Sequence, residues 1–299
     1  MNTSSRATSP RYIIISPVKD EEAYVECTLR SVTSQSLRPA LWVIVDDGSK
    51  DSTAEIVSRY IDFHPFLRLV HNPHTGVRQT NSAEIRAFNV GYESIGETDY
   101  DFIVKLDGDL SFEPDYFAKL LGRFNGNDRL GIASGVYLEM DGSGVWKEVA
   151  MPSYHAAGAC KVIRRECFEE IGGFLVARGW DTVDEIRAMT RGWKTGHFRE
   201  LQMKHHKVEG SGMGAIRTSV MHGEIYYLTG GSKLFLLLKV LHRMGTKPYL
   251  VGALALFRGY LKAMWGRETP LVTKTEARCY RSLLHARLMN QVKTPLPRN

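Results

Sequence analysis

The sequence predicts an α/β fold with a mostly parallel sheet flanked by helices, followed by a basic helical extension. Short apolar runs alternate with helical patterns through the front half of the chain, a pattern typical of βαβ units. The runs are continuously apolar, as strands covered on both faces require. Near residue 225 the composition becomes apolar and basic. We therefore expect two domains, over residues 10–224 and 225–299.

Four strand and helix pairs are expected in order along the front half. The predicted strands are YIIIS, LWVIV, LRLV and DFIVKL, and the helices after them span about 23–32, 53–60, 83–94 and 115–124. Further strands follow residue 131, and then a helix spans about 182–190. The turns SPVKDEE, DDGSKDS, HNPHTG and DGDLSFEP follow the four strands. In a parallel sheet these turns meet at the carboxyl edge, where ligands of open α/β sheets bind.

The composition is ordinary for a globular protein. The chain has 299 residues, of which 43% are hydrophobic and 24% charged, and this excludes a disordered chain. The four cysteines form no C-x-x-C pair or zinc-type cluster, so we expect free thiols in a reducing compartment. The first residues lack the apolar core of a signal peptide, and we expect a cytoplasmic protein.

Charge is distributed unevenly along the chain. Residues 225–299 hold 13 Lys and Arg against two acids, a net charge of +11, and the remainder holds 26 against 31, a net charge of −5. The segments KLFLLLKVLHRM and KPYLVGALALFRGYLKAMWG predict amphipathic basic helices. Their longest uncharged apolar run is about half of the roughly 20 residues that a membrane span needs. These helices either lie on an anionic membrane surface or pack on their own domain.

The stretch VKLDGDLSFEP places two aspartates one residue apart, directly after an apolar run. Asp107 and Asp109 would repel each other, and a divalent cation between them would remove the repulsion. Mg²⁺ and Mn²⁺ prefer oxygen ligands and bridge to substrate phosphates. The alternative is a turn with two exposed acids. The motif by itself therefore indicates a cation site only weakly.

Four blocks in a fixed order give this motif a context. PVKDEE, VIVDDGSKDST, IRAFNVGYES and KLDGDLSFEPDYF are followed by GGF and GWDTVDEIRAMTRGWKT. In this order and spacing the chain resembles a family 2 glycosyltransferase of the GT-A fold, among the bacterial members of polysaccharide biosynthesis. The resemblance covers residues 11–206. It implies that residues 10–224 form a nucleotide-sugar-binding and catalytic domain, which uses Mn²⁺ or Mg²⁺ and favours a UDP-sugar.

The resemblance also implies which residues bind the nucleoside of the donor. Pro17, Val18 and Glu21 lie on the first loop, where the family wraps the nucleoside. Asp46 and Asp47 follow the second strand, and a carboxylate there accepts the imide proton of a uracil base. The alternative for one of these two acids is an N-cap for the next helix.

The diphosphate side of the donor is assigned in the same way. Arg86, in IRAFN, occupies the basic position of its motif, and a guanidinium binds two phosphate oxygens at once. Arg78 is a second candidate, because its loop HNPHTGVRQ is rich in basic residues. Asp107 and Gly108 are expected at the donor, and Asp107 and Asp109 at the metal. A surface arginine is the alternative for Arg86.

The general base and the last metal ligand come from later in the chain. The family supplies the base in a Glu-Asp pair, and here Asp181 matches the Asp while Trp180 replaces the Glu. Asp184 shares the helical face of Asp181 and is a second candidate, and N-capping is the alternative role of Asp181. The resemblance also implies a late histidine that completes the metal site or contacts the diphosphate, and His205 and His206 lie at its place. Adjacent histidines on a strand point to opposite faces, so at most one of them is a ligand, and we favour His206.

The expected reaction is inverting transfer of a sugar to a saccharide or lipid-linked acceptor in surface or exopolysaccharide synthesis. The basic extension favours peripheral contact with an anionic membrane, at the inner face of the cell membrane. Nucleic acid is not an expected partner, because no helix-turn-helix, zinc finger or RNA-stacking motif is present. The alternatives are a nucleotidyltransferase, although SPVKDEE lacks a glycine-rich phosphate loop, and a catalytically inactive membrane- or nucleic-acid-binding module.

Overall fold

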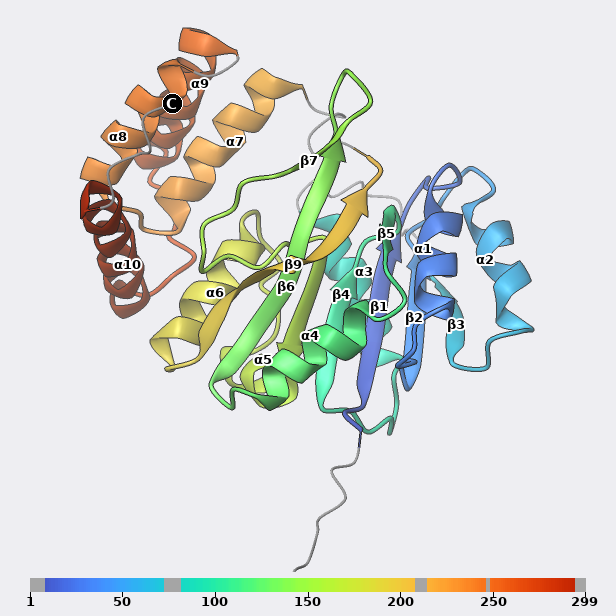
Figure 1. Cartoon of the computed structure of the whole chain (residues 1–299). Helices are drawn as coiled ribbons and strands as arrows, with labels where there is room; N and C mark the ends of the chain where they lie inside the picture. The colour runs from blue at the N-terminus through green and yellow to red at the C-terminus, as the bar shows by residue number, and fades with distance from the viewer. Residues whose placement is uncertain (1–8, 73–81, 208–213, 246–247, 294–299) are drawn as a thin grey trace, which may run out of the picture. The chain divides into compact units, whose positions relative to one another are not determined.

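A computed structural model of the chain describes residues 9–72, 82–207, 214–245 and 248–293 (Figure 1). The chain divides into two compact units, and each is described here by itself. The sheet unit comprises Met1–Val176 and Trp193–Lys207. The helical unit comprises Ala177–Gly192 and Val208–Asn299.

The sheet unit has the predicted α/β architecture, with one sheet of nine strands in the order β3-β2-β1-β4-β8-β6-β9-β5 and β7 beside β6. Strands β3, β2, β1 and β4 are parallel, as the alternating pattern predicted. Its strands are β1 Tyr12–Val18, β2 Leu41–Asp46, β3 Leu67–His71, β4 Phe102–Leu106, β5 Leu110–Phe112, β6 Leu130–Met140, β7 Trp146–Glu148, β8 Cys160–Arg164 and β9 Lys194–His205. Its helices are α1 Val25–Thr33, α2 Thr53–Ile61, α3 Ala83–Glu93, α4 Tyr116–Asn125 and α5 Arg165–Ile171.

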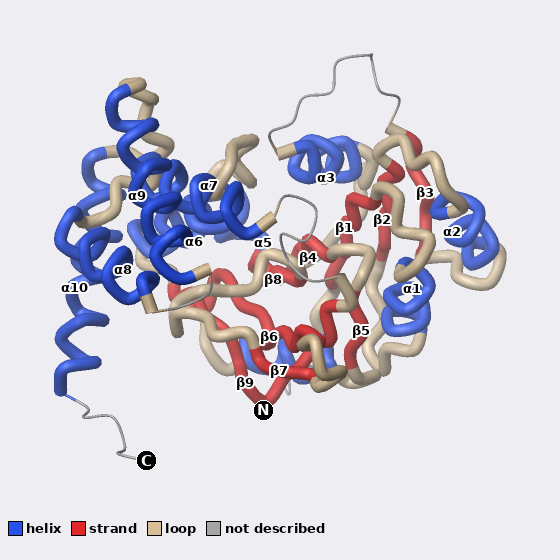
Figure 2. Tube along the Cα trace, turned by 90° about the horizontal axis from the view of Figure 1, so that it is seen from above, coloured by secondary structure: helices blue, strands red, loops and turns tan. Residues whose placement is uncertain are grey.

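Helices cover both faces of the parallel strands. Tyr12 and Ile14 of β1 belong to the core shared with α1 and α4, whereas Ile15 lies against Gly91 of α3 on the other face. Figure 2 shows α3 and α1 on opposite sides of β1 and β2. Burial of successive residues on both faces explains why the strands read as continuous apolar runs.

The later strands form the antiparallel part of the sheet. Strand β8 pairs antiparallel with β4 and β6, and β5 pairs antiparallel with β9. The long strand β9 runs parallel to β6, with a shift of register between Gly135 and Val136. After this shift, His205 lies opposite Glu139 of β6 and Leu110 of β5. The last residue of β9 is thereby brought next to the DGD turn.

The helical unit consists of α6 Trp180–Thr190, α7 Ala215–Leu228, α8 Lys233–Met244, α9 Tyr249–Trp265 and α10 Lys274–Lys293. Helices α7 and α9 approach closely, because a Cβ atom on Gly223 would lie 1.9 Å from the Leu256 carbonyl oxygen. One on Gly259 would lie 2.0 Å from the carbonyl oxygen of Val220. Among the described residues, no helix combines the length and the apolar character that crossing a membrane requires.

The two units do not coincide with the two predicted domains. The composition changes near Ile225, but this residue lies inside α7. Helices α6 and α7 belong to the same compact unit as the C-terminal helices. The assignment of catalysis to residues 10–224 is a statement about function, and it stays a prediction.

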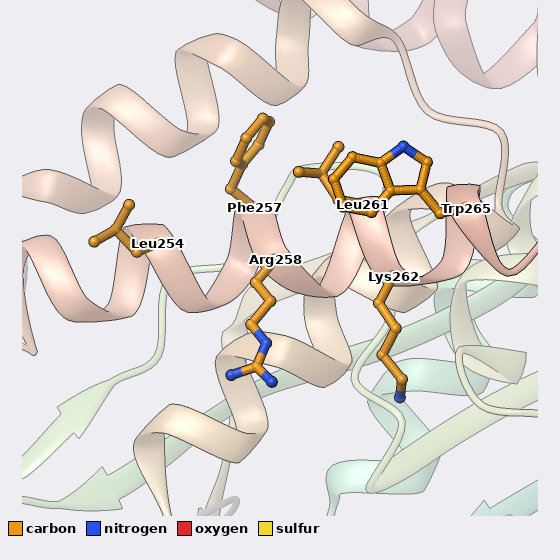
Figure 3. Close-up of a pocket in the computed structure, with 6 residues that line it drawn as sticks. All are labelled: Leu254, Phe257, Arg258, Leu261, Lys262 and Trp265. Atoms are coloured by element: carbon orange, nitrogen blue, oxygen red, sulfur yellow. The ribbon is translucent and has the colours of Figure 1, made fainter.

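Helices α8 and α9 turn their large apolar side chains outward. The buried face of α9 consists mainly of small residues: Gly252, Ala253, Ala255, Leu256, Gly259, Tyr260 and Ala263. We call the exposed side chains of both helices the outer apolar face: Leu234, Leu237, Leu238, Leu241, Met244, Tyr249, Leu250, Val251, Leu254, Phe257 and Trp265. Figure 3 shows Phe257, Leu261 and Trp265 on one side of α9, and Arg258 and Lys262 on the other.

Candidate active site

The carboxyl edge of the parallel strands brings the first predicted donor residues together. Val18 at the end of β1 lies opposite Asp46 at the end of β2, and Asp46 lies opposite His71 of β3. The backbone N–H of Asp47 donates to the carbonyl oxygen of Val18 at 2.9 Å. Pro17 is the residue before Val18 in the same strand. The register of β1 and β2 therefore fixes these residues at one edge of the sheet.

The two acids after β2 are buried and hydrogen-bonded. Asp46 Oδ1 accepts the backbone N–H of Ser49 at 2.9 Å, and Asp46 Oδ2 lies 3.2 Å from His71 Nδ1. Asp47 Oδ1 accepts Nδ2 of Asn72 at 2.7 Å. The N–H of Thr53 at the start of α2 is instead accepted by Asp51. Asp46 thus shapes the turn after β2, and the hydrogen bonds described for Asp46 and Asp47 do not cap α2.

Glu21 approaches the DGD turn from the first loop. Its Oε1 accepts from Lys207 Nζ at 2.8 Å, whereas Oε2 is buried and has no hydrogen-bond partner in the described part of the chain. Burial raises the pKa of Glu21, against the opposing effect of Lys207. Gly108 lies under the same loop, and a Cβ atom there would lie 2.8 Å from Val18 Cγ1. The glycine of the DGD turn therefore allows the first loop to pack closely on it.

Lys105 supplies the positive charge that the two aspartates require. It lies two residues before Asp107 and so shares its side of the strand. Its Nζ donates to Asp107 Oδ1 at 2.5 Å, lies 3.8 Å from Glu84 Oε2, and belongs to a side chain that is 2% exposed. Burial raises the pKa of Asp107 to about 6, although Lys105 opposes the rise. Burial would lower the pKa of Lys105, but Asp107 and Glu84 raise it above its ordinary value.

The second aspartate of the DGD turn, Asp109, contacts a different partner from Asp107. Asp109 is 5% exposed, and its Oδ1 is buried without a hydrogen-bond partner among the described residues. Its Oδ2 lies 3.2 Å from His205 Nε2, and His205 Nδ1 lies 3.3 Å from Glu139 Oε1. Burial lowers the pKa of His205, but the bond to Asp109 outweighs it, and the net change is upward. Asp109 Oδ1 is therefore the oxygen that remains available to coordinate a cation.

The histidine beside the Asp109 carboxylate is His205, and not His206 as the sequence favours. The side chain of His206 points elsewhere, with its Nε2 2.8 Å from Ser111 Oγ and its ring stacked on Tyr24 at 6.0 Å between centroids. The two rings face different partners, as adjacent residues of a strand do, but strand alternation alone does not determine which ring faces Asp109. The role of His206 as a metal ligand stays a prediction.

The residues of this edge fit a divalent cation that a substrate helps to hold. Within the described residues, no group of three His, Cys, Asp or Glu side chains forms a complete metal site. Mg²⁺ characteristically takes one or two carboxylates from the protein and completes its shell with waters and substrate phosphates. The unpartnered oxygen of Asp109 and the neighbouring Asp107 carboxylate are donors of this kind.

The predicted diphosphate arginines are only partly described. Arg86 lies half-buried on α3, the helix whose Glu84 approaches Lys105. Arg78 lies outside the described residues. Lys105 is the residue at this edge that sequence reasoning missed. The available signal was its position two residues before Asp107 at the end of an apolar strand.

Both candidates for the general base belong to the helical unit. Helix α6 begins after Gly179, whose φ of +78° is the left-handed value that favours glycine. Asp181 lies in the first turn and is half-buried. Asp184 is 2% exposed, and its Oδ1 accepts the backbone N–H of Glu185 at 2.6 Å. Asp181 is therefore the more accessible of the two carboxylates.

The chain matches a family model described as Glycosyl transferase family 2 over residues 13–176, more than half of its length. An uncharacterised glycosyltransferase of Haemophilus influenzae is 31% identical over 112 residues, which are 38% of this chain and 41% of that protein. A poly-beta-1,6-N-acetyl-D-glucosamine synthase of Staphylococcus epidermidis is 29% identical over 116 residues, or 39% of this chain and 26% of the synthase. The matched region thus spans about two-fifths of these relatives or less.

Two solved structures show a similar fold at low sequence identity. The mannosyltransferase PcManGT from Pyrobaculum calidifontis, in complex with GDP-Man and Mn²⁺, has a TM-score of 0.56 and 16% identity, covering 96% of this chain and 81% of that one. S. aureus TarS 1–349 with UDP-GlcNAc has a TM-score of 0.54 and 14% identity, covering 90% and 78%. These two likenesses show the fold alone.

Proposed function

The chain belongs to glycosyl transferase family 2 and has the GT-A fold, and from this premise we propose that it transfers a sugar from a nucleotide-sugar donor to a saccharide or lipid-linked acceptor. The observation that carries the proposal is the carboxyl edge of the parallel strands, where Asp46 ends β2 and where Asp107 and Asp109 follow β4. A UDP-sugar is the favoured donor, and surface or exopolysaccharide synthesis is the favoured setting.

The nucleoside of the donor binds at the first loop and the turn after β2. Asp46 and Asp47 supply acceptors for a base N–H, and the backbone of Pro17 and Val18 with Glu21 encloses the nucleoside. These roles are supported by the shared register of β1 and β2 and by the close packing of the first loop on the DGD turn.

The diphosphate binds beside Asp107, Gly108 and Asp109. Lys105 holds Asp107 in place through its 2.5 Å contact, and Arg86 and Arg78 bind phosphate oxygens. Asp109 and Asp107 would hold Mn²⁺ or Mg²⁺, with a ligand from His205 or His206. The bound cation would supply positive charge to the departing diphosphate. Asp109 Oδ1, buried and unpartnered in the described part of the chain, supports this assignment.

Asp181 acts as the general base. A carboxylate that accepts the proton of the acceptor hydroxyl lets the hydroxyl oxygen attack the anomeric carbon from the face opposite the nucleotide, and the product is inverted. The half-exposed position of Asp181 in the first turn of α6 favours it over the buried Asp184. Asp184 is kept as the second candidate.

The outer apolar face supports peripheral binding to an anionic membrane, at the cytoplasmic face of the cell membrane. Leu254 and Trp265 are 67% and 73% exposed, and Arg258 and Lys262 line the same hollow of α9. Apolar side chains flanked by basic ones bind anionic bilayers by burial of apolar area together with electrostatic attraction. A lipid-linked acceptor would be presented at this surface.

The first test is the thermal stability of the wild type and of Asp109→Ala with UDP, GDP, dTDP or CDP, with and without Mn²⁺. One nucleotide should raise the midpoint of unfolding only when Mn²⁺ and Asp109 are both present. A screen of sugars on that nucleotide then identifies the donor. No stabilisation by any nucleotide at millimolar concentration would reject the proposed donor site.

A further inference from the structure

Acidic side chains are scarce in the C-terminal part of the helical unit, and most of them are buried. From residue 224 onward the chain has three acids, which are Glu224, Glu268 and Glu276. Glu268 is exposed, whereas Glu224 and Glu276 are only 5% and 7% exposed. A buried carboxylate is unfavourable unless it is paired, so the partners of these two acids show what they hold.

Both buried acids bind arginines at the ends of α6. Arg178 Nη1, two residues before the helix, donates to Glu224 Oε2 at 2.9 Å. At the other end of the helix, Glu276 Oε1 lies 4.0 Å from Arg187 Nε and 3.6 Å from Arg191 Nη1. Helix α6 carries both candidates for the general base. Each of its ends is therefore held by a buried glutamate of the same unit.

The Glu224 carboxylate is itself held from two sides. Its Oε1 accepts from Lys262 Nζ of α9 at 2.6 Å, while its Oε2 accepts from Arg178. The Glu224 side chain is 7% exposed, whereas those of Arg178 and Lys262 are 40% and 65% exposed. The two cations compensate the buried charge, and together they fix the carboxylate between α9 and the start of α6.

The start of α6 also packs directly on α7, at the residue after Glu224. Gly179 precedes the helix with a φ of +78°, and a Cβ atom there would lie 2.6 Å from Ile225 Cγ2. The Gly179 carbonyl oxygen accepts two backbone N–H groups of the first turn of α6, each at 3.0 Å. Asp181 lies in this turn. Two adjacent residues of α7 therefore determine where the turn that carries Asp181 begins.

We propose that Glu224 is a positioning residue for the general base, and that it holds the Asp181 carboxylate in place through Arg178 and the first turn of α6. This inference rests on the proposed function, because it takes Asp181 to be the base. A base has to lie within hydrogen-bond reach of the proton that it accepts, and a displacement of about 1 Å can lower the rate about 100-fold. Because Arg178 is three residues before Asp181, a shift of Arg178 moves the turn that carries the base.

The test measures hydrolysis of a UDP-sugar in the presence of Mn²⁺, with water in place of the acceptor. The water oxygen forms a bond to the anomeric carbon, the bond between this carbon and the diphosphate oxygen breaks, and Asp181 accepts the proton. The probe is the UDP-sugar from which the wild type releases UDP fastest. Full-length chains are used throughout.

Glu224→Gln should lower kcat by about tenfold or more with little change in KM, because the base is displaced while the donor site is intact. The matched control is Glu276→Gln, which removes an equally buried acid from the other end of α6. Both variants should lower the midpoint of unfolding, since each leaves buried or half-buried arginine without its partner. Only Glu224→Gln should lose turnover. An equal loss of kcat in the control would assign both acids to folding and overturn the proposal.

Combined variants separate positioning of the base from a general structural role. Arg178→Gln with Glu224→Gln should be no slower than either single variant, because both break the same ion pair. Arg178→Lys keeps the cation and should retain more activity than Arg178→Gln. In the background of Asp181→Asn, Glu224→Gln should cause no further loss, because a base that is absent cannot be displaced. A further loss in that background would show that Glu224 acts on another group and would overturn the proposal.

Failure of the proposed function gives a different pattern of results. UDP with Mn²⁺ should raise the midpoint of unfolding of the wild type and of each variant by the same amount. No such stabilisation of the wild type would reject the donor site, and with it the role of Glu224. If the stabilisation is present but Asp181→Asn hydrolyses the donor as fast as the wild type, the donor site stands and only the inference about the base and Glu224 is overturned.

Discussion

The sheet unit and the α8–α9 pair bury their apolar residues in opposite ways. In the sheet unit the largest side chains are inside, and Trp42, Tyr12 and Phe102 are almost fully buried. In α9 the inward face consists mainly of glycine and alanine, with Leu256 and Tyr260 among them, while Leu254 and Trp265 face outward. The first arrangement is that of a protein core, and the second exposes an apolar surface of the kind that marks interaction sites.

Hydropathy alone therefore does not reveal whether apolar residues form a core or an exposed surface. Burial of the strands stabilises the folded sheet unit at about 25 cal/mol per Å² of apolar area. The apolar area that α8 and α9 leave exposed contributes no such stabilisation until another surface covers it. Variants of the sheet unit should therefore leave the binding properties of the α8–α9 surface unchanged. Variants of that surface should leave the stability of the sheet unit unchanged.

Asp109→Ala should have the largest effect on the chemistry. Loss of the carboxylate with the unpartnered oxygen should lower kcat by about 1,000-fold, because stabilisation of the leaving diphosphate is lost. The variant should bind anionic vesicles as the wild type does. Steady-state kinetics and vesicle flotation measure the two properties, and Asp128→Ala, an exposed acid of the sheet unit, is the control. Unchanged kcat in Asp109→Ala would show that the DGD edge is not the site.

Asp181→Asn should lower kcat by about 100-fold with little change in the binding of the nucleotide, because only proton removal from the acceptor is affected. Asp184→Asn should instead lower the midpoint of unfolding, because this carboxylate is buried and accepts a hydrogen bond from Glu185. The pair of variants separates chemistry from folding within one helix. If Asp184→Asn alone abolished turnover while remaining stably folded, the base would be Asp184.

Leu254→Glu combined with Phe257→Glu should weaken binding to anionic vesicles by about tenfold or more, because each buried apolar side chain contributes about 1.5–3 kcal/mol. Vesicle flotation at low and high salt measures the loss, and the wild type should also bind less at high salt. Phe63→Glu is the matched control, since Phe63 is 79% exposed in the sheet unit. If the control variant lost as much binding, the outer apolar face would not be the membrane surface.

The same substitution should act with opposite sign in the two units. Gly259→Ala should lower the free energy of unfolding by about 1–3 kcal/mol, because the new methyl group meets the Val220 carbonyl oxygen. Gly122→Ala should raise it by up to about 1 kcal/mol, because Gly122 lies in helix α4 with no atom near the new group. Denaturant unfolding measures both. A stable Gly259→Ala would show that α7 and α9 can separate without cost.

The smallest effect is a dependence of stability on pH. Burial in the folded chain lowers the pKa of His222, a residue of α7, from its ordinary value of about 6.5 to about 4. Between these two pH values the unfolded chain therefore binds more protons than the folded chain does. The stabilisation is present above pH 6.5 and is lost as the pH falls toward 4. His222→Asn should reduce this slope in urea unfolding followed from pH 4 to 7. If the variant showed the same slope as the wild type, His222 would not be the group responsible for the pH dependence.

Much of the fold could be predicted, because each buried strand is a continuous apolar run followed by a polar turn. The same logic placed Asp46, Asp107 and Asp109 at one edge. Sequence reasoning could not choose between His205 and His206, because that depends on the register that β9 adopts after its irregularity beside β6. Sequence reasoning also missed Lys105, because a single lysine in an apolar strand gives no sign that it contacts Asp107. The position of the Lys239 ammonium over the Tyr226 ring of α7 depends on how the C-terminal helices pack, which the sequence does not reveal.

The register of β9 also bears on insertions and deletions in this strand. His205 lies opposite Leu110, and a slip of β9 by one residue would move His206 into that position. Because both neighbours are histidine, an imidazole would still lie opposite Leu110 after such a slip. A deletion of one residue at the β6–β9 irregularity would therefore keep a histidine at this edge, although it replaces the residue at every other position of the strand end.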